Sequence, residues 1–158
     1  MSQANLRTAP PVELHVAARP VDRLNRAERL TIGGLAATLA GLLIVGTWLS
    51  PAPTGMGTHQ QLGLPPCTLY FLVGMRCPGC GMTTSWAYML EGRLVESFQA
   101  NSGGALLCLM AIWATPITIW LAYRGRPTAN GWFSYYAAIG LVISMGVAVV
   151  EWILRLLN

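Results

Sequence analysis

The sequence contains no lysine, and acidic residues are few. All ten positive charges are arginines, against six Asp and Glu residues, which gives a net charge of +4 over 158 residues. Charged residues make up only 10% of the chain and hydrophobic residues 54%, whereas a soluble domain carries about 25% charged residues. This scarcity of charge excludes an ordinary soluble domain and predicts an integral membrane protein.

The excess of basic residues does not indicate nucleic-acid binding. The arginines flank apolar segments, and no stripe of base-stacking aromatic residues accompanies them. We therefore expect the lipid bilayer, and no nucleic acid, as a partner.

Three long segments carry no charge at all, and they are residues 32–49, 105–123 and 132–150. Each is close to the roughly 20 residues that an α-helix needs to cross a bilayer. The pattern predicts an all-α membrane protein with three transmembrane helices in a single membrane domain, residues 29–158. Residues 1–28, which contain three prolines, are predicted to form a cytoplasmic and largely disordered tail.

Two of these segments carry small residues at every fourth position. Such stripes allow another helix to approach closely. We expect them to pack against another membrane protein, another copy of the chain, or another helix of the same chain. The stripes are Gly33, Ala37 and Gly41 in the first segment, and Gly140, Ser144 and Ala148 in the third.

The distribution of arginine predicts the orientation in the membrane, because cytoplasmic loops carry the excess of basic residues. One side holds Arg7, Arg19, Arg23, Arg26, Arg29, Arg124 and Arg126, and the other holds Arg76, Arg93 and Arg155. Seven against three favours a multi-pass protein of the cell (inner) membrane with a cytoplasmic N-terminus and an extracytoplasmic loop between the first two spans.

That loop, residues 64–101, contains the motif CPGCG at residues 77–81 and is predicted to form one or two short amphipathic or re-entrant helices. Residues 67–75 are apolar but too short to span. Pro78 suits the first position of a helix that ends at Gly92. With Met82, Trp86 and Met89 on one face, and Thr84, Tyr88 and Glu91 on the other, we expect this helix to lie along the membrane surface or against the bundle. We expect the hydroxyls of Thr83, Thr84 and Ser85 to satisfy donors at its start.

The cysteines admit three interpretations. In the first, Cys77 and Cys80 are a catalytic redox pair for thiol–disulfide exchange, because a helix start would stabilise the Cys77 thiolate, and Cys67 relays electrons. The βαβ pattern of thioredoxin is absent from the surroundings.

In the second interpretation Cys67, Cys77 and Cys80 are metal ligands, with zinc as the candidate ion and His59 or Cys108 as the fourth ligand. A second C-x-x-C, which would strengthen this assignment, is missing. Apart from this zinc ion, no cofactor is predicted. In the third and favoured interpretation the cysteines hold a structural or partner-binding element together, by packing or by a disulfide from Cys67.

An ordered set of residues resembles the domain-of-unknown-function 2752 family of bacterial membrane proteins over about residues 64–123. The matching residues are Cys67, Gly74, Cys77, Pro78, Gly79, Cys80, Gly81, Met82, Thr83, Gly92 and Asn101. Thr84 stands where the family commonly has arginine, and Ser102 where it has proline. The family has no assigned activity, so the resemblance implies the membrane architecture and the importance of the cysteines only.

Overall fold

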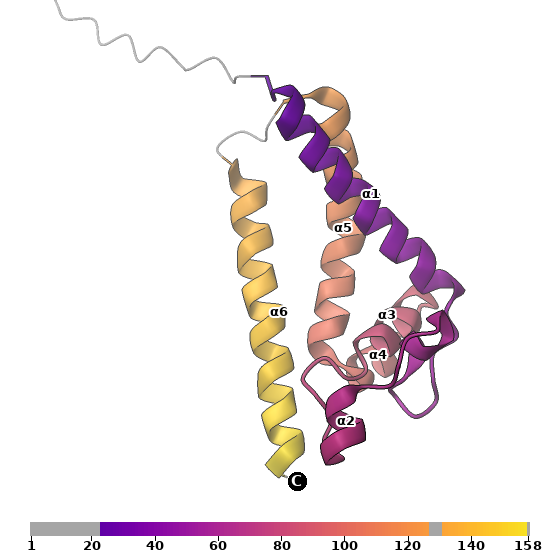
Figure 1. Cartoon of the computed structure of the whole chain (residues 1–158). Coiled ribbons are helices and arrows are strands. Elements are labelled where there is room, and N and C mark those ends of the chain that lie inside the picture. Colours follow the sequence, from indigo (N-terminus) through magenta and orange to yellow (C-terminus); the bar gives the residue numbers. More distant parts are fainter. Residues whose placement is uncertain (1–22, 127–130, 158) are drawn as a thin grey trace, which may run out of the picture.

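A computed structural model describes residues 23–126 and 131–157, and in these residues every regular element is helical (Figure 1). The predicted tail, residues 1–28, lies mostly outside them. The elements in chain order are α1 (Arg26–Trp48), the 3-10 helix η1 (Thr58–Leu62), α2 (Thr68–Val73), α3 (Met82–Leu90), α4 (Leu94–Ala100), α5 (Ser102–Arg124) and α6 (Trp132–Leu157). The all-α prediction is confirmed, and the short helices lie between the first and second long ones.

The helices α1, α5 and α6 are long and apolar enough to cross a membrane. They contain 23, 23 and 26 residues, which corresponds to about 35 to 39 Å. Helix α1 begins earlier than predicted because Asn25 and Glu28 form a capping box, in which each side chain accepts a hydrogen bond from the other's backbone N–H at 2.8 Å.

Helix α5 lies between α1 and α6 and packs on both (Figure 1). The small-residue stripe of α6 faces α5, since Ser144 and Ala148 are almost fully buried. A Cβ added to Gly103 of α5 would lie 2.5 Å from the Cβ of Ala148. The stripe of α6 therefore packs within the chain, whereas a Cβ added to Gly33 or Gly41 of α1 would meet nothing within 4 Å. For the stripe of α1, a partner stays a prediction.

The short helices α3 and α4 pack on each other and on α5, near the end where α1 stops and α5 starts. Thr84, Ser85 and Tyr88 of α3 are buried. The hydroxyls of Thr84 and Thr58 lie 2.8 Å apart, and those of Ser85 and Ser97 lie 3.0 Å apart. Helix α3 thus lies against the bundle, which is one of the two predicted placements, and its polar face is buried there. The predicted helix-start role of these two hydroxyls is wrong, because they find hydrogen-bond partners inside the protein.

The C-terminal part of α6 is fixed to the start of α5. Glu151 and Arg155 form an ion pair, and Glu151 also accepts a hydrogen bond from the backbone N–H of Ser102 at 2.8 Å. Arg155 donates to the carbonyl of Ala100 at 3.1 Å. The indole N–H of Trp152 donates to the carbonyl of Arg76 at 2.6 Å. These contacts bring α6 beside the chain that leads into the CPGCG motif.

Candidate metal centre

The CPGCG motif forms a turn and not the start of a helix. The N–H of Cys80 donates to the carbonyl of Cys77 at 3.0 Å, and that of Met82 to the carbonyl of Gly79 at 3.1 Å. Gly81 follows in the left-handed region, with φ of +89°, and α3 begins only at Met82. The predicted helix start at Cys77 is therefore wrong, because the backbone reverses at Gly81. The argument that a helix dipole stabilises the Cys77 thiolate is lost with it.

Asn101 holds this turn in place. Its side-chain N–H group donates to the carbonyls of Pro78 at 3.0 Å and Cys80 at 3.2 Å, and its side-chain oxygen accepts from the N–H of Gly104 at 2.7 Å. The side chain is only 2% exposed. This double role of Asn101 was not predicted from the sequence. The available signal was its position directly before a long apolar segment, which is typical of a helix N-cap.

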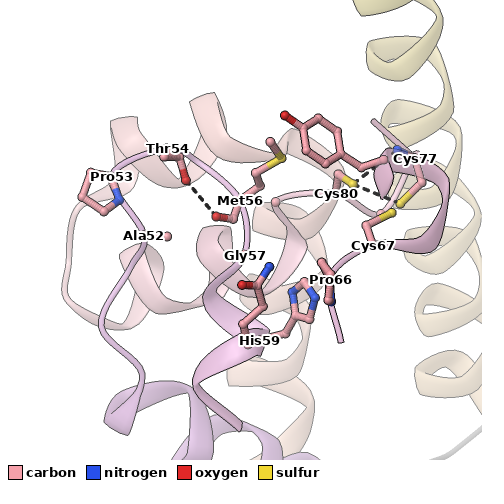
Figure 2. A pocket seen from close by; sticks show the side chains of 14 residues that line it. Ala52, Pro53, Thr54, Met56, Gly57, His59, Pro66, Cys67, Cys77 and Cys80 are labelled. Atoms are coloured by element: carbon pink, nitrogen blue, oxygen red, sulfur yellow. Dashed lines mark hydrogen bonds between the residues drawn. The ribbon is translucent and has the colours of Figure 1, made fainter. Parts of the chain in front are cut away.

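The turn and the start of α2 bring three sulfur atoms together. Cys67 is the N-cap of α2, and its Sγ lies with those of Cys77 and Cys80 in a cluster in which all three are within 4.8 Å of one another. The Cys77 and Cys80 sulfurs lie 3.3 Å apart, and the N–H of Cys77 donates to the sulfur of Cys80, also at 3.3 Å (Figure 2). All three are free thiols. Residues that are thirteen positions apart in sequence thus form one group of soft donors.

The surroundings shift the pKa values of two of these thiols in opposite directions. The pKa of the Cys67 thiol is lowered to about 7, chiefly by the backbone N–H of Tyr70 and then by hydrogen bonds from Cys80 and Cys77. Burial, followed by the hydrogen bond with Cys77, raises the pKa of Cys80 to about 12. At neutral pH Cys67 is partly a thiolate, while Cys80 keeps its proton unless a cation replaces it.

The three cysteines line one wall of a cavity of about 630 Å³. The opposite wall comes from the loop that follows α1 and from η1, including Met56 and His59 (Figure 2). His59, a predicted fourth ligand, lines the cavity but lies outside the sulfur cluster, and its Nε2 is 3.1 Å from the carbonyl oxygen of Pro65. Cys108, the other predicted fourth ligand, is fully buried in α5 and packs near Met89.

The matched region of the chain coincides with this site. Residues 67–115 match the model of the DUF2752 family, a protein family of unknown function. This region is therefore similar to the DUF2752 family. The predicted resemblance is thereby confirmed, and the region contains the three clustered cysteines and Asn101. No curated protein and no solved structure matches the chain.

Proposed function

We propose that this small membrane protein of the DUF2752 family holds a thiophilic metal ion at Cys67, Cys77 and Cys80, with zinc as the first candidate. The observation that supports this function is the convergence of three sulfurs on one wall of a cavity. Thiolates are soft ligands that zinc and copper(I) prefer.

The spacing of the sulfurs favours a metal over a disulfide. A tetrahedral zinc with bonds of 2.3 Å needs sulfurs about 3.8 Å apart, so the 3.3 Å between Cys77 and Cys80 has to open by about 0.5 Å. A disulfide needs the same pair to close by about 1.2 Å. A disulfide also uses only two of the three sulfurs, whereas a metal ion uses all three.

The ion would have a structural effect on this region. Helix α2 contains no buried residue, so it contributes little packing of its own. A metal would tie the start of α2, through Cys67, to the turn that carries Cys77 and Cys80. Its fourth coordination position would face the cavity and accept water or a donor from a partner, which is the arrangement of open zinc sites.

Thiol–disulfide exchange is the second candidate, and the lowered pKa of Cys67 favours it. In this reaction a disulfide-containing partner first oxidises Cys77 and Cys80 to a disulfide and leaves with their two protons and two electrons as a dithiol. The Cys67 thiolate then attacks the sulfur of Cys77. A Cys67–Cys77 bond forms, the Cys77–Cys80 bond breaks, and the Cys80 thiolate takes up a proton.

Metal analysis of the purified full chain tests the proposal. The protein is expressed with added zinc, and metal per chain is measured by mass spectrometry. We expect about one equivalent, lost in Cys67→Ser, Cys77→Ser and Cys80→Ser and retained in the matched control Cys108→Ser, since Cys108 lies in α5 away from the cluster.

The same samples distinguish the second candidate. Thiol–disulfide exchange predicts no metal, and a Cys77–Cys80 disulfide that persists in Cys67→Ser and appears as a mass loss of about 2 Da, the two hydrogens removed by disulfide formation. A folded wild-type protein with neither metal nor disulfide would contradict both candidates and leave a packing role for the cysteines.

We further propose that the cluster faces the extracytoplasmic side of the inner membrane. The contacts between helix ends support a three-span arrangement. Arg29 of α1 contacts the C-terminal end of α5, whereas Arg155 of α6 contacts the residues just before the N-terminal end of α5. The arginine-rich end is then cytoplasmic, and the cysteines lie at the other end.

A further inference from the structure

Four arginines line a pocket of about 430 Å³ at the end of the molecule opposite the cysteine cluster. Its lining residues come from the start of α1, the residues just before it and the end of α5. These two helix ends lie side by side (Figure 1). No acidic residue is among the described residues that line it, which are Arg23, Leu24, Arg29, Arg124, Gly125 and Arg126. The pocket therefore concentrates positive charge without an internal counter-ion.

Hydrogen bonds fix the walls of this pocket. The N–H of Leu24 donates to the carbonyl of Gly125 at 2.9 Å. The guanidinium of Arg29 donates to the carbonyls of Ala122 at 3.2 Å and Tyr123 at 3.4 Å, which are among the last carbonyls of α5. A guanidinium has five N–H donors, so these two contacts leave donors of Arg29 for a ligand.

The absence of a side chain at Gly125 contributes to this geometry. A Cβ at this position would lie 3.3 to 3.4 Å from the guanidinium and Cδ atoms of Arg29. A second arginine is also oriented by a specific contact, since the guanidinium carbon of Arg124 lies 4.6 Å from the ring centre of Trp120. Two of the four cations are thus preorganised by the fold.

We propose that this pocket binds the phosphate of an anionic phospholipid headgroup. The planar fork of arginine matches two phosphate oxygens at once. The arginines stand at the ends of two membrane-crossing helices, which is the level of the headgroups. Basic pockets between the ends of transmembrane helices are typical lipid-headgroup sites.

Exposed apolar side chains beside the pocket favour a lipid over a soluble phosphate. Leu30, which follows Arg29 in the chain, is 76% exposed. Tyr123, which precedes Arg124, is 85% exposed. Ile119 and Trp120 are also half exposed on α5. These side chains offer a surface to the acyl chains of a lipid whose phosphate occupies the pocket, and a free phosphate would make no use of them.

Lipid retention by the full chain tests the proposal. The protein is purified in micelles that contain equal amounts of phosphatidylglycerol and phosphatidylcholine, and the lipids that remain bound are counted by native mass spectrometry. We expect phosphatidylglycerol to be enriched. Arg29→Gln should reduce the enrichment about fivefold, the effect of one arginine near an anionic headgroup.

Arg26→Gln is the matched control. Arg26 lies on the same first turn of α1, is exposed and does not line the pocket, so this change should leave the enrichment intact. Because Arg29 also holds the end of α5, the double variant Arg23→Gln/Arg126→Gln is a second test. It removes charge from the pocket, so it should also reduce the enrichment of phosphatidylglycerol. It keeps the hydrogen bonds of Arg29, so its melting temperature should match that of the wild type.

Two results would overturn the proposal. An equal loss of enrichment in Arg26→Gln would mean that the lipid responds to general surface charge. A wild-type protein that shows no preference for phosphatidylglycerol, yet is stabilised against heat by millimolar inorganic phosphate in an Arg29-dependent manner, would identify the ligand as a free phosphate. Neither result depends on the occupancy of the cysteine cluster.

Discussion

Asn101 donates a side-chain hydrogen bond to the carbonyl of Cys80 at 3.2 Å, so the residue that caps α5 also fixes the turn that carries two of the three clustered cysteines. This contact joins a membrane-crossing helix to the candidate metal centre. Movement at the start of α5 would therefore change the position of the Cys80 sulfur, and the geometry of the cluster depends on a residue that contributes no ligand to it.

The substitution Asn101→Ala should destabilise the protein and weaken metal binding. It removes an N-cap and leaves the part-buried carbonyl of Pro78 and the buried carbonyl of Cys80 without the side-chain donor. We expect a loss of about 2 to 4 kcal/mol in the free energy of unfolding, measured by thermal or denaturant unfolding in detergent, together with lower metal content.

Two further variants separate the roles of Asn101. Asn101→Asp keeps an acceptor for Gly104 but faces the two carbonyls with an oxygen, so it should lose metal with a smaller change in α5. Asn25→Ala removes the exposed N-cap of α1 and should cost about 1 kcal/mol without affecting metal. Metal loss in Asn25→Ala equal to that in Asn101→Ala would contradict the specific role of Asn101.

Gly81→Ala should be far more damaging than Gly92→Ala, although both glycines have positive φ, +89° and +81°. A Cβ at Gly92 meets nothing within 4 Å, whereas one at Gly81 would lie 2.6 Å from the carbonyl oxygen of Ala100 and 2.8 Å from that of Gly55. Gly92→Ala should cost about 1 to 2 kcal/mol from backbone strain alone. Gly81→Ala should cost at least about 1 to 3 kcal/mol more, or prevent folding. Equal melting temperatures for the two variants would show that the turn does not pack against α4 as described.

The three membrane-crossing helices could be predicted because absence of charge over about 20 residues is a property of each segment by itself. The exact ends of these helices were harder to predict, since α1 starts at Arg26 because of the capping box of Asn25 and Glu28. The buried polar face of α3 was beyond sequence reasoning, because the partner of Thr84 is Thr58, 26 residues away.

The residues of the candidate site could be named from the sequence, but not their arrangement. The C-x-x-C motif identified Cys77 and Cys80, whereas the approach of Cys67 depends on how the chain folds between residues 67 and 77. From the sequence, the arginines predicted the orientation but no binding pocket. That Arg29 and Arg124 line one pocket follows from the packing of α1 on α5, which no local pattern contains.

The reactivity of Cys67 in the metal-free protein should depend on pH with a midpoint near 7. Its pKa is lowered to about 7, so the reactive thiolate predominates above pH 7 and is lost as the pH falls below it. Alkylation by iodoacetamide, followed at each cysteine by peptide mass spectrometry, should show this midpoint for Cys67. Cys80, whose pKa is raised to about 12, should stay unmodified over the same range.

The variant Cys80→Ala provides the comparison for that experiment. Because a hydrogen bond from Cys80 helps to lower the pKa of Cys67, its removal should move the alkylation midpoint of Cys67 upward. An unchanged midpoint would mean that the thiols do not interact, and the cluster would lose its electrostatic support.

Labelling of intact cells with a membrane-impermeant maleimide, after treatment with a chelator and a mild reductant, should modify Cys67. This result follows from an extracytoplasmic cluster, because Cys67 is partly exposed and the pKa of its thiol is lowered to about 7. Cys108 is fully buried in α5 and should stay unlabelled.

The matched control for the labelling experiment is Arg26→Cys in a chain with serine at all three cluster positions. Arg26 is exposed at the opposite end, so this variant should react only after the cells are permeabilised. The reverse pattern would place the cluster in the cytoplasm, where a reducing environment disfavours a disulfide and leaves metal binding as the stronger of the two chemistries.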